Sequence, residues 1–261
     1  MSAVIAPHGA NTGLAAQLAA ALDPVQFARS IGIEPDPWQA TVLRSTSKRL
    51  LLNCSRQSGK STTTALVALH TALYEPGALV LILAPSQRQS AELFRTVAAL
   101  YGATGGMMPP KAESALRLEL ENGSRIVSLP ASADKIRGYA AVHTLVIDEA
   151  AFTQDELYLS VLPMLATTNG RLVALSTPYG RTGWWAEAWF GTGDWQRVEV
   201  TAHDCPRITP EFLQEQRESM GDWWFRQEFL CEFLDDATAL FSSEDLLLAQ
   251  TREQVDTWEI L

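Results

Sequence analysis

Short apolar runs alternate along this chain with longer segments whose apolar residues recur at helical spacing. Continuous apolar runs are typical of strands buried on both faces of a parallel sheet, and they occur at 50–52, 79–83, 144–147 and 172–175, with a further strand expected at 198–200. Helices are predicted over 14–31, 59–73, 86–100 and 154–165, at a short segment opened by Asp36-Pro37, and beyond Pro210. This alternation predicts an α/β fold, with helices on both faces of a central, mostly parallel sheet.

One pair of expected strands, 116–120 and 125–129, is separated by the sequence Glu-Asn-Gly-Ser. An Asn-Gly pair between two such runs is typical of a tight turn in a β-hairpin. We therefore expect an antiparallel hairpin attached to the parallel sheet.

The segment 50–64, LLLNCSRQSGKSTTT, passes from an apolar run through a polar turn into a helix. A phosphate-binding loop needs this order of strand, loop and helix, with backbone N–H groups around the phosphates, a lysine on the β- and γ-phosphates and a hydroxyl on Mg²⁺. The alternative is a chance Gly-Lys-Ser at the start of a surface helix, since Cys54 stands where the general pattern has glycine. The predicted nucleotide-binding residues are Ser55, Arg56, Gln57, Ser58, Gly59, Lys60, Ser61 and Thr62, with Lys60 on the phosphates and Ser61 on the metal.

A second motif places two carboxylates after the apolar run 145–147, in the order Asp148-Glu149. Parallel α/β sheets bind their ligands at the carboxyl ends of strands. We expect Asp148 to bind Mg²⁺ and Glu149 to polarise the attacking water as a general base. Acids that merely begin a helix are the alternative. The pair also favours the P-loop class that has an additional strand between the two motifs, and we expect 79–83 to be that strand.

Two further segments carry polar groups to the same region. Ser176-Thr177-Pro178 follows the run 172–175, and its hydroxyls are placed to sense the γ-phosphate and pass the change onward; the alternative is an ordinary helix cap. Trp38-Gln39 precedes the first strand, and a glutamine amide offers the donor and the acceptor that adenine needs.

Composition narrows the class of protein. The chain has 261 residues, 47% of them apolar and 19% charged, as in globular proteins. Its three cysteines provide neither a disulfide framework nor a zinc cluster. The longest apolar run, 78–84, is too short to cross a bilayer, so we expect no membrane partner.

The net charge of −10 lies in the last part of the chain, where residues 201–261 carry 14 acidic and 4 basic side chains. Solvated helix faces are one interpretation of this acidic segment. The other is an acidic element that docks on a basic surface of a neighbouring subunit or domain. Acidity counts against a simple DNA-binding module, but not against a motor that touches DNA through a local basic surface.

Together these segments resemble the ATPase domain of the large terminase subunit of tailed bacteriophages. The resemblance spans roughly residues 30–245, and Cys54 in place of glycine follows the family's usual variant. The matching segments are Pro37-Trp38-Gln39, the loop 54–62 with its arginine, 146–150, Ser176-Thr177-Pro178, and WWFRQEFLCEFL at 223–234, which resembles the family's connection to a nuclease domain.

The resemblance implies a P-loop NTPase of the additional-strand, catalytic-glutamate class, which uses ATP and Mg²⁺ to drive double-stranded DNA into a procapsid. It also implies a portal protein and a small terminase subunit as partners, and a homo-oligomeric ring when assembled. The location it implies is the host cytoplasm, transiently on the procapsid.

Members of this family also need an arginine finger, a cation placed on the charge of the transition state. Arg56 lies in the phosphate-binding loop and would act within its own subunit. Arg137, in Lys135-Ile136-Arg137-Gly138, precedes the strand that ends at Asp148 and would reach a neighbour's ATP. We favour Arg137 in trans, with Arg56 contacting phosphate or positioning the loop; a surface salt bridge is the alternative for each.

The expected organisation is an ATPase domain over residues 1–245, with an N-terminal helical extension over 1–30. Residues 246–261 are expected to begin a linker towards a nuclease domain that this sequence lacks, because the residues beyond Phe241 are too few for such a fold. We therefore expect no nuclease activity from this chain.

Two other functions compete with the packaging motor. A helicase-like translocase is suggested by Ala84-Pro85-Ser86-Gln87 after a strand, but it requires a second similar domain that this length does not hold. A nucleotide-binding assembly protein that hydrolyses nothing is the other, and Glu149 argues against it, because binding alone needs no water-polarising carboxylate.

Overall fold

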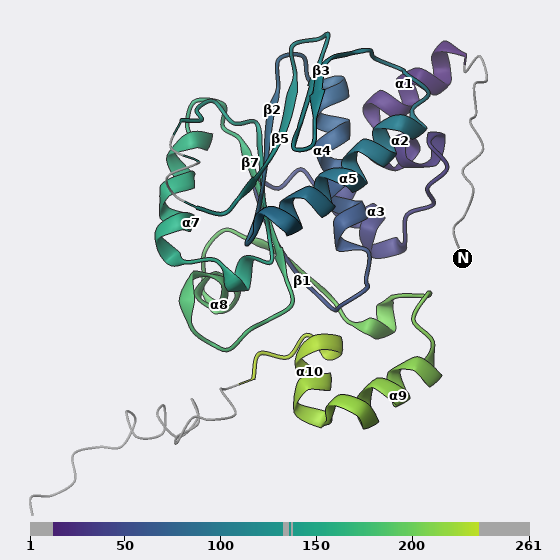
Figure 1. The fold of residues 1–261 in the computed structure, drawn as a ribbon. Helices are drawn as coiled ribbons and strands as arrows, with labels where there is room; N and C mark the ends of the chain where they lie inside the picture. Colours follow the sequence, from purple (N-terminus) through teal and green to yellow (C-terminus); the bar gives the residue numbers. More distant parts are fainter. Residues whose placement is uncertain (1–12, 133–135, 137, 235–261) are drawn as a thin grey trace, which may run out of the picture.

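A single sheet with helices on both faces organises the computed structural model, which describes residues 13–132, 136 and 138–234 (Figure 1). Helices α1 to α5 lie over one face, and α7 and α8 lie over the other (Figure 1). The fold class expected from the sequence is therefore confirmed, as a three-layer α/β arrangement.

The sheet has eight strands in the order β3-β4-β5-β2-β6-β7-β1-β8. The strands β5, β2, β6, β7, β1 and β8 pair in parallel, each with the next. At one edge of the sheet, β3, β4 and β5 form an antiparallel meander. The strands are β1 (Arg49–Cys54), β2 (Leu79–Ala84), β3 (Pro110–Ser114), β4 (Arg117–Leu120), β5 (Arg125–Pro130), β6 (Thr144–Asp148), β7 (Arg171–Ser176) and β8 (Gln196–Val200).

The helices α3, α4, α5 and α7 lie where the sequence predicts helices, whereas α8 was not predicted. On the first face they are α1 (Leu14–Leu22), α2 (Pro24–Ser30), α3 (Pro37–Arg44), α4 (Lys60–Tyr74) and α5 (Gln87–Ala103). On the second face they are α7 (Asp155–Val161) and α8 (Gly183–Phe190), with the 3₁₀ turns η1 (Ala150–Phe152) and η2 (Leu162–Leu165). The 3₁₀ turn η3 (Ala202–Asp204) follows β8 and leads to α9 (Pro210–Met220) and α10 (Asp222–Leu230).

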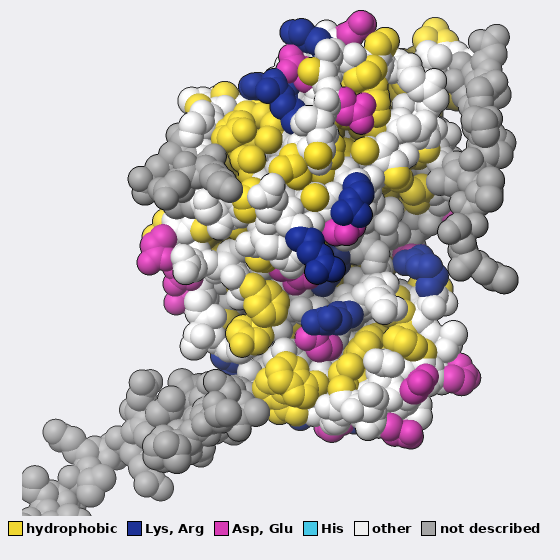
Figure 2. Space-filling model, in the orientation of Figure 1, with side chains coloured by type: hydrophobic (Ala, Val, Ile, Leu, Met, Phe, Trp, Pro, Cys, Tyr) yellow, Lys and Arg dark blue, Asp and Glu magenta, His cyan; other side chains and the backbone are white. Residues whose placement is uncertain are grey.

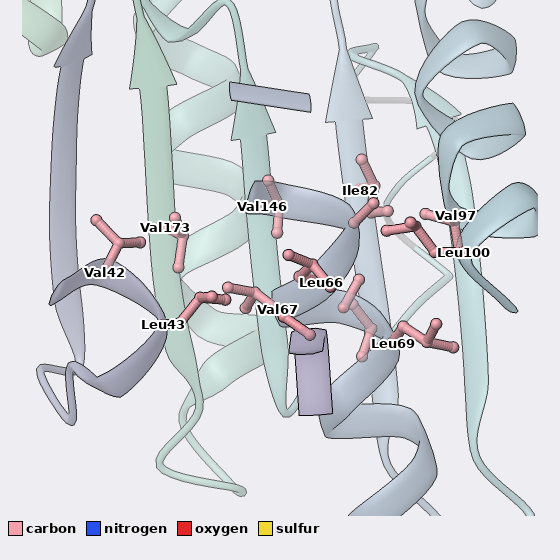
Figure 3. Close-up of a cluster of buried hydrophobic side chains, with 14 of the residues drawn as sticks. Val42, Leu43, Leu66, Val67, Leu69, Ile82, Val97, Leu100, Val146 and Val173 are labelled. Atoms are coloured by element: carbon pink, nitrogen blue, oxygen red, sulfur yellow. The ribbon is translucent and has the colours of Figure 1, made fainter. Parts of the chain in front are cut away.

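Two hydrophobic clusters hold the layers together, one on each face of the sheet. Figure 3 shows part of the first, where side chains of α3, α4 and α5 point onto β2, β6 and β7. The strand Leu79–Ala84 is buried along its whole length, as expected of a central parallel strand. A third, smaller cluster joins α9 and α10 through Leu213, Phe225 and Phe229.

The additional strand expected at 79–83 was assigned to the wrong position. In the sheet, β7 lies between the phosphate-loop strand β1 and the acidic strand β6, whereas β2 lies on the far side of β6. The chain order of the strands does not determine their order in the sheet, because each crossover helix allows a strand to be placed on either side.

Two elements also differ from the expected boundaries. The helix predicted over 14–31 is two helices, because Asp23 has an extended backbone and Pro24 starts α2. Strand β3 was not predicted, since its five residues are all exposed and it carries no apolar alternation. Among the described residues, no helix is long and apolar enough to cross a membrane.

Candidate functional site

The loop between β1 and α4 has the backbone shape of a phosphate cradle. Gln57 and Gly59 have left-handed backbones, with φ of 59° and 99°. The Ser58 hydroxyl donates to the Ser55 carbonyl at 2.9 Å, which closes the turn on itself. Ser61 is exposed and Thr62 half-buried in the first turn of α4. The turn directs the start of α4, with its unpaired N–H groups, towards the space at the end of β1.

Cys54 belongs to the core beneath this loop. It is fully buried, and burial raises the pKa of its thiol to about 12, so the thiol is neutral at physiological pH. The Cys54 carbonyl accepts a hydrogen bond from Lys60 Nζ at 3.3 Å. A side chain is therefore accommodated at this position without disturbing the lysine.

Lys60 and Glu149 face each other across the carboxyl ends of β1 and β6. Lys60 Nζ lies 3.9 Å from Glu149 Oε1, and the Ser176 hydroxyl lies 3.5 Å from Glu149 Oε2. Glu149 has a left-handed backbone, with φ of 50° and ψ of 48°, which a non-glycine residue adopts only under constraint. This turn directs the carboxylate back over the sheet edge, towards Lys60 and the end of β7.

These side chains border an open cleft of about 470 Å³. Such a volume accommodates a small ligand. The cleft is lined by Arg56, Gln57, Lys60, Pro85, Gln89, Glu149, Phe152 and Thr177. Figure 2 shows Lys and Arg side chains gathered in the middle of this face, between the main sheet and the α9–α10 pair. The cleft thus combines a cation, a carboxylate and polar backbone, which suits an anionic ligand.

Asp148 ends β6 directly before Glu149. Burial, and next the charge of Glu149, raise the pKa of its carboxyl to about 6. Two adjacent carboxylates with one lysine nearby are short of positive charge, and a divalent cation would supply it. The oxygens of Asp148 and Ser61 therefore fit Mg²⁺ in chemical type.

The segment Ser176-Thr177-Pro178 is buried at the end of β7. Because β7 lies between β1 and β6, its end is adjacent to both Lys60 and Glu149. Thr177 lines the cleft, and Ser176 contacts the carboxylate of Glu149. The structure thus brings this segment to the cleft; that it senses the γ-phosphate remains a prediction.

Arg56 is held by a carboxylate from the C-terminal helix pair. Its Nε and Nη2 donate to the two carboxylate oxygens of Glu228 at 2.5 and 3.2 Å, and its backbone N–H donates to the Glu228 carbonyl at 2.9 Å. The Arg56 side chain is 64% exposed and that of Glu228 only 10%. One acid of the acidic segment therefore docks on a cation of the phosphate loop within the same chain.

Gln39, of the upstream pair Trp38-Gln39, contacts the phosphate loop. Both residues are buried. Gln39 Oε1 accepts from the Asp36 N–H at 2.9 Å, while its Nε2 donates to the Thr63 hydroxyl at 3.0 Å and to the Gly59 carbonyl at 3.4 Å. The amide thus binds the loop itself, and its predicted contact with adenine remains a prediction.

Three residues at this edge were not predicted as site residues from the sequence, namely Glu228, Asp36 and Arg207. Arg207, from the loop after η3, forms a two-point ion pair with Asp36 and donates to the Ser58 carbonyl at 3.2 Å. The sequence predicted for Asp36 only that it starts the short helix α3. No local pattern marks Arg207 or Glu228, because their ion-pair partners lie more than 170 positions earlier.

Arg137 lies outside the described residues, and so does Lys135. The neighbouring Ile136 is fully buried in the hydrophobic cluster under α7 and α8. The choice between Arg137 and Arg56 as the finger therefore stays a prediction.

Comparison with known proteins gives a consistent result. A family model described as terminase large subunit, T4likevirus-type, N-terminal, matches residues 51–248. The terminase large subunit of Thermus phage G20c is 26% identical over an alignment of 270 residues. The alignment covers 89% of this chain and 55% of the relative. The chain spans about half the length of the curated relatives it matches.

Solved structures show the same fold. The large terminase ATPase domain of Thermus phage P74-26 matches with a TM-score of 0.67 and 23% identity, over 80% of this chain and 98% of that domain. A large terminase from a thermophilic bacteriophage, solved in complex with ADP, matches with a TM-score of 0.62 and 12% identity, over 76% of this chain and 54% of the other. Since the family model covers most of its length, this chain belongs to the terminase large subunit family of T4likevirus type, in its N-terminal part.

Proposed function

We propose that this chain is an ATP-hydrolysing motor domain that drives double-stranded viral DNA into a procapsid. The observation that carries the proposal is the placement of Lys60 and Glu149, with a nitrogen-to-oxygen distance of 3.9 Å, at the edge of the cleft. A phosphate cradle alone would serve binding. A carboxylate facing the lysine in addition is what hydrolysis of the terminal phosphate needs.

In this mechanism the start of α4 and Lys60 bind the phosphates and fix the γ-phosphate beside Glu149. The Glu149 carboxylate orients a water in line with the γ-phosphate and accepts its proton as the new P–O bond forms and the bond to the leaving ADP breaks. Ser176, whose hydroxyl lies 3.5 Å from the same carboxylate, would respond when the phosphate leaves. Mg²⁺ held by Ser61 and Asp148 would neutralise charge on the phosphate oxygens.

Family membership and the domain's relatives support the wider assignment. A packaging motor acts with a portal protein and a small terminase subunit, as a ring of identical subunits, in the host cytoplasm. Under this proposal the domain comprises residues 1–245, and the segment 246–261 leads onward from it.

The test separates binding from turnover in two variants. Lys60→Ala should lose most ATP binding, because the main cation on the phosphates is removed. Glu149→Gln should keep ATP binding but lose turnover by at least a hundredfold, because the water loses its base. Equilibrium binding of ATP and steady-state phosphate release measure the two effects.

Matched controls are Lys48→Ala and Glu156→Gln, which change exposed residues of the same types away from the cleft. Both should behave as the wild type. Turnover by Glu149→Gln at the wild-type rate would refute the catalytic assignment. A wild-type protein that binds ATP without hydrolysing it, under conditions of assembly, would instead favour a nucleotide-binding assembly protein.

A further inference from the structure

Arg207 lies beside the phosphate loop because of the sheet topology. It is in the loop that follows η3, after the last strand β8. Since β8 pairs in parallel with β1, both strands deliver their following loops to the same edge of the sheet. Arg207, which follows the last strand of the sheet, is thereby brought next to the loop that precedes α4.

The guanidinium of Arg207 is fixed on one side and open on the other. Its Nη1 and Nη2 donate to the two oxygens of Asp36 at 2.9 and 2.6 Å, and Nη2 also donates to the Ser58 carbonyl at 3.2 Å. Asp36 is 9% exposed, whereas the Arg207 side chain is 55% exposed. Such a two-point pair with a buried acid sets the plane of a guanidinium while it leaves a face of that plane accessible.

The phosphate loop has two sides with different neighbours. Lys60 is directed towards Glu149, which marks the end of the site where the γ-phosphate would be cleaved. On the other side, a Cβ atom added to Gly59 would meet Gln39 Nε2 at 2.8 Å and Arg207 Nη2 at 3.3 Å. A nucleotide whose γ-phosphate lies between Lys60 and Glu149 would extend its sugar and base away from Glu149. Arg207 and Gln39 are the side chains that approach the loop at Gly59, one residue before Lys60.

Gln39 has little capacity left to bind a base by itself. Its Nε2 protons are directed to Thr63 and to the Gly59 carbonyl, and its Oε1 already accepts from the backbone of Asp36. One acceptor lone pair of the amide remains. A base at this end therefore needs a second protein group, and a planar cation is well suited, because guanidinium groups stack on aromatic faces.

We propose that Arg207 forms the nucleobase subsite, with its guanidinium plane stacked on the base of the nucleotide whose phosphates lie on the loop 54–61. Asp36 is the positioning residue that fixes this plane. The inference rests on the proposed nucleotide site and adds to it the group that binds the base. It concerns the base alone and makes no change to the hydrolytic step.

The experiment compares a ligand that has a base with one that has none. ATP and inorganic tripolyphosphate are titrated calorimetrically into the wild type, Arg207→Ala and Arg207→Lys. Arg207→Ala should weaken ATP binding by roughly tenfold, in the range of a cation stacked on an aromatic ring, and leave tripolyphosphate binding unchanged. Arg207→Lys should also lose most of the effect, because an ammonium group has no plane to stack.

Arg44→Ala is the matched control, since Arg44 forms a similar two-point pair with Asp23 outside the cleft. It should change neither affinity. If Arg207→Ala weakens the binding of ATP and of tripolyphosphate equally, the inference is overturned, and Arg207 only positions the Ser58 carbonyl. The inference is also overturned if Arg207→Ala weakens the binding of neither ligand. If Arg207→Ala fails to fold, Arg207→Lys allows the same comparison. Failure of the nucleotide site itself is distinct, because the wild type would then bind neither ligand.

Discussion

At the scale of single residues, two adjacent carboxylates lie at the cleft, and the positive charge of the protein balances them only in part. Asp148 and Glu149 are adjacent at the end of β6, and Lys60 Nζ lies 3.9 Å from the Glu149 carboxylate. The left-handed backbone of Glu149 adds strain to this charge repulsion. Both costs are expected under the proposed function, which requires a bound cation and a general base at this site.

The raised pKa of Asp148 predicts that ionisation of this carboxyl lowers the stability of the metal-free folded protein as pH rises. With a folded-state pKa of about 6, above the value of 3.8 for a free side chain, the folded protein binds this proton more tightly than the unfolded chain. The free energy of unfolding therefore falls as pH rises from about 4 through 6, by about 3 kcal/mol. In EDTA, Asp148→Asn should raise the melting temperature at pH 8 and have little effect at pH 4, while Mg²⁺-dependent hydrolysis is lost.

Asp194→Asn, which changes an exposed acid before β8, is the control for this comparison. It should leave the melting temperature close to that of the wild type at each pH. Thermal unfolding curves across pH 4 to 8 give the answer. A constant difference between Asp148→Asn and the wild type over that range would contradict the predicted ionisation cost.

The candidate residues that lie together at the cleft were predictable where they are contiguous in sequence. The loop 54–62 and Asp148-Glu149 each join a strand end to polar groups, so the local pattern suffices to predict that they meet at one edge of the sheet. Arg207 and Glu228 could not be found in this way. Their roles depend on how β8, α9 and α10 return to the phosphate loop, and that is a property of the folded chain.

At the scale of elements, the helix pair α9–α10 forms a small unit bound to the nucleotide edge of the sheet. It has its own cluster of apolar side chains and is tied to the phosphate loop by Arg56 and Glu228. Asn53 in β1 also donates to the Cys231 carbonyl at 2.9 Å. Arg56 and Gln57 line both the nucleotide cleft and a second cavity of about 420 Å³ against Phe212 and Trp224. They therefore lie between the cleft and the helix pair.

Glu228→Gln should loosen α10 and release Arg56 at the same time. Without the carboxylate charge, the guanidinium is free to turn towards the phosphates, so ATP affinity should rise by roughly two- to fivefold, the range of a partly exposed ion pair. Hydrogen exchange in α9 and α10 should become faster, while exchange in β1 and β6 stays unchanged. Calorimetry and exchange mass spectrometry measure the two effects.

Glu215→Gln on the exposed face of α9 provides the matched control and should change neither quantity. A fall in ATP affinity in Glu228→Gln would show that the ion pair holds the loop in its binding shape. In that case Arg56 would act from its present position rather than by moving to the phosphate.

Element prediction from sequence succeeded where burial is complete and failed where it is not. The buried strands β2, β6 and β7 were found, as was the hairpin of β4 and β5, whose Gly123 has a left-handed backbone. The exposed edge strand β3 has no apolar pattern and was missed. The position of β7 between β1 and β6 was also missed, because strand order depends on packing between distant segments.

At the scale of the whole molecule, the charge distribution now has a partial explanation. The acidic segment is not only a solvated surface, because Glu228 is nearly buried against Arg56. Other acids of α9, such as Glu211, Glu215 and Glu218, are exposed on its outer side. Under the proposed function several such subunits form a ring, and an arginine finger acting in trans would couple hydrolysis in one subunit to its neighbour.

The predicted role of Arg137 in trans gives the sharpest test of assembly. Arg137→Ala should bind ATP normally and lose turnover by about a thousandfold, as expected when a finger is removed. Mixing Arg137→Ala with Glu149→Gln should partly restore hydrolysis in assembled rings. In such a ring, an Arg137→Ala subunit keeps its own Lys60 and Glu149 and receives the finger of a Glu149→Gln neighbour.

Arg56→Ala mixed with Glu149→Gln is the control, because a residue that acts within its own site cannot be supplied by a neighbour. The mixtures are measured at high protein concentration or with added portal, with assembly followed by sedimentation and turnover by phosphate release. Restored turnover in the first mixture alone supports Arg137 as the finger. If both mixtures stay inactive although assembly is confirmed, the assignment in trans fails and Arg137 has a structural or DNA-facing role. Restoration in both would instead show that Arg56 also acts across the subunit interface.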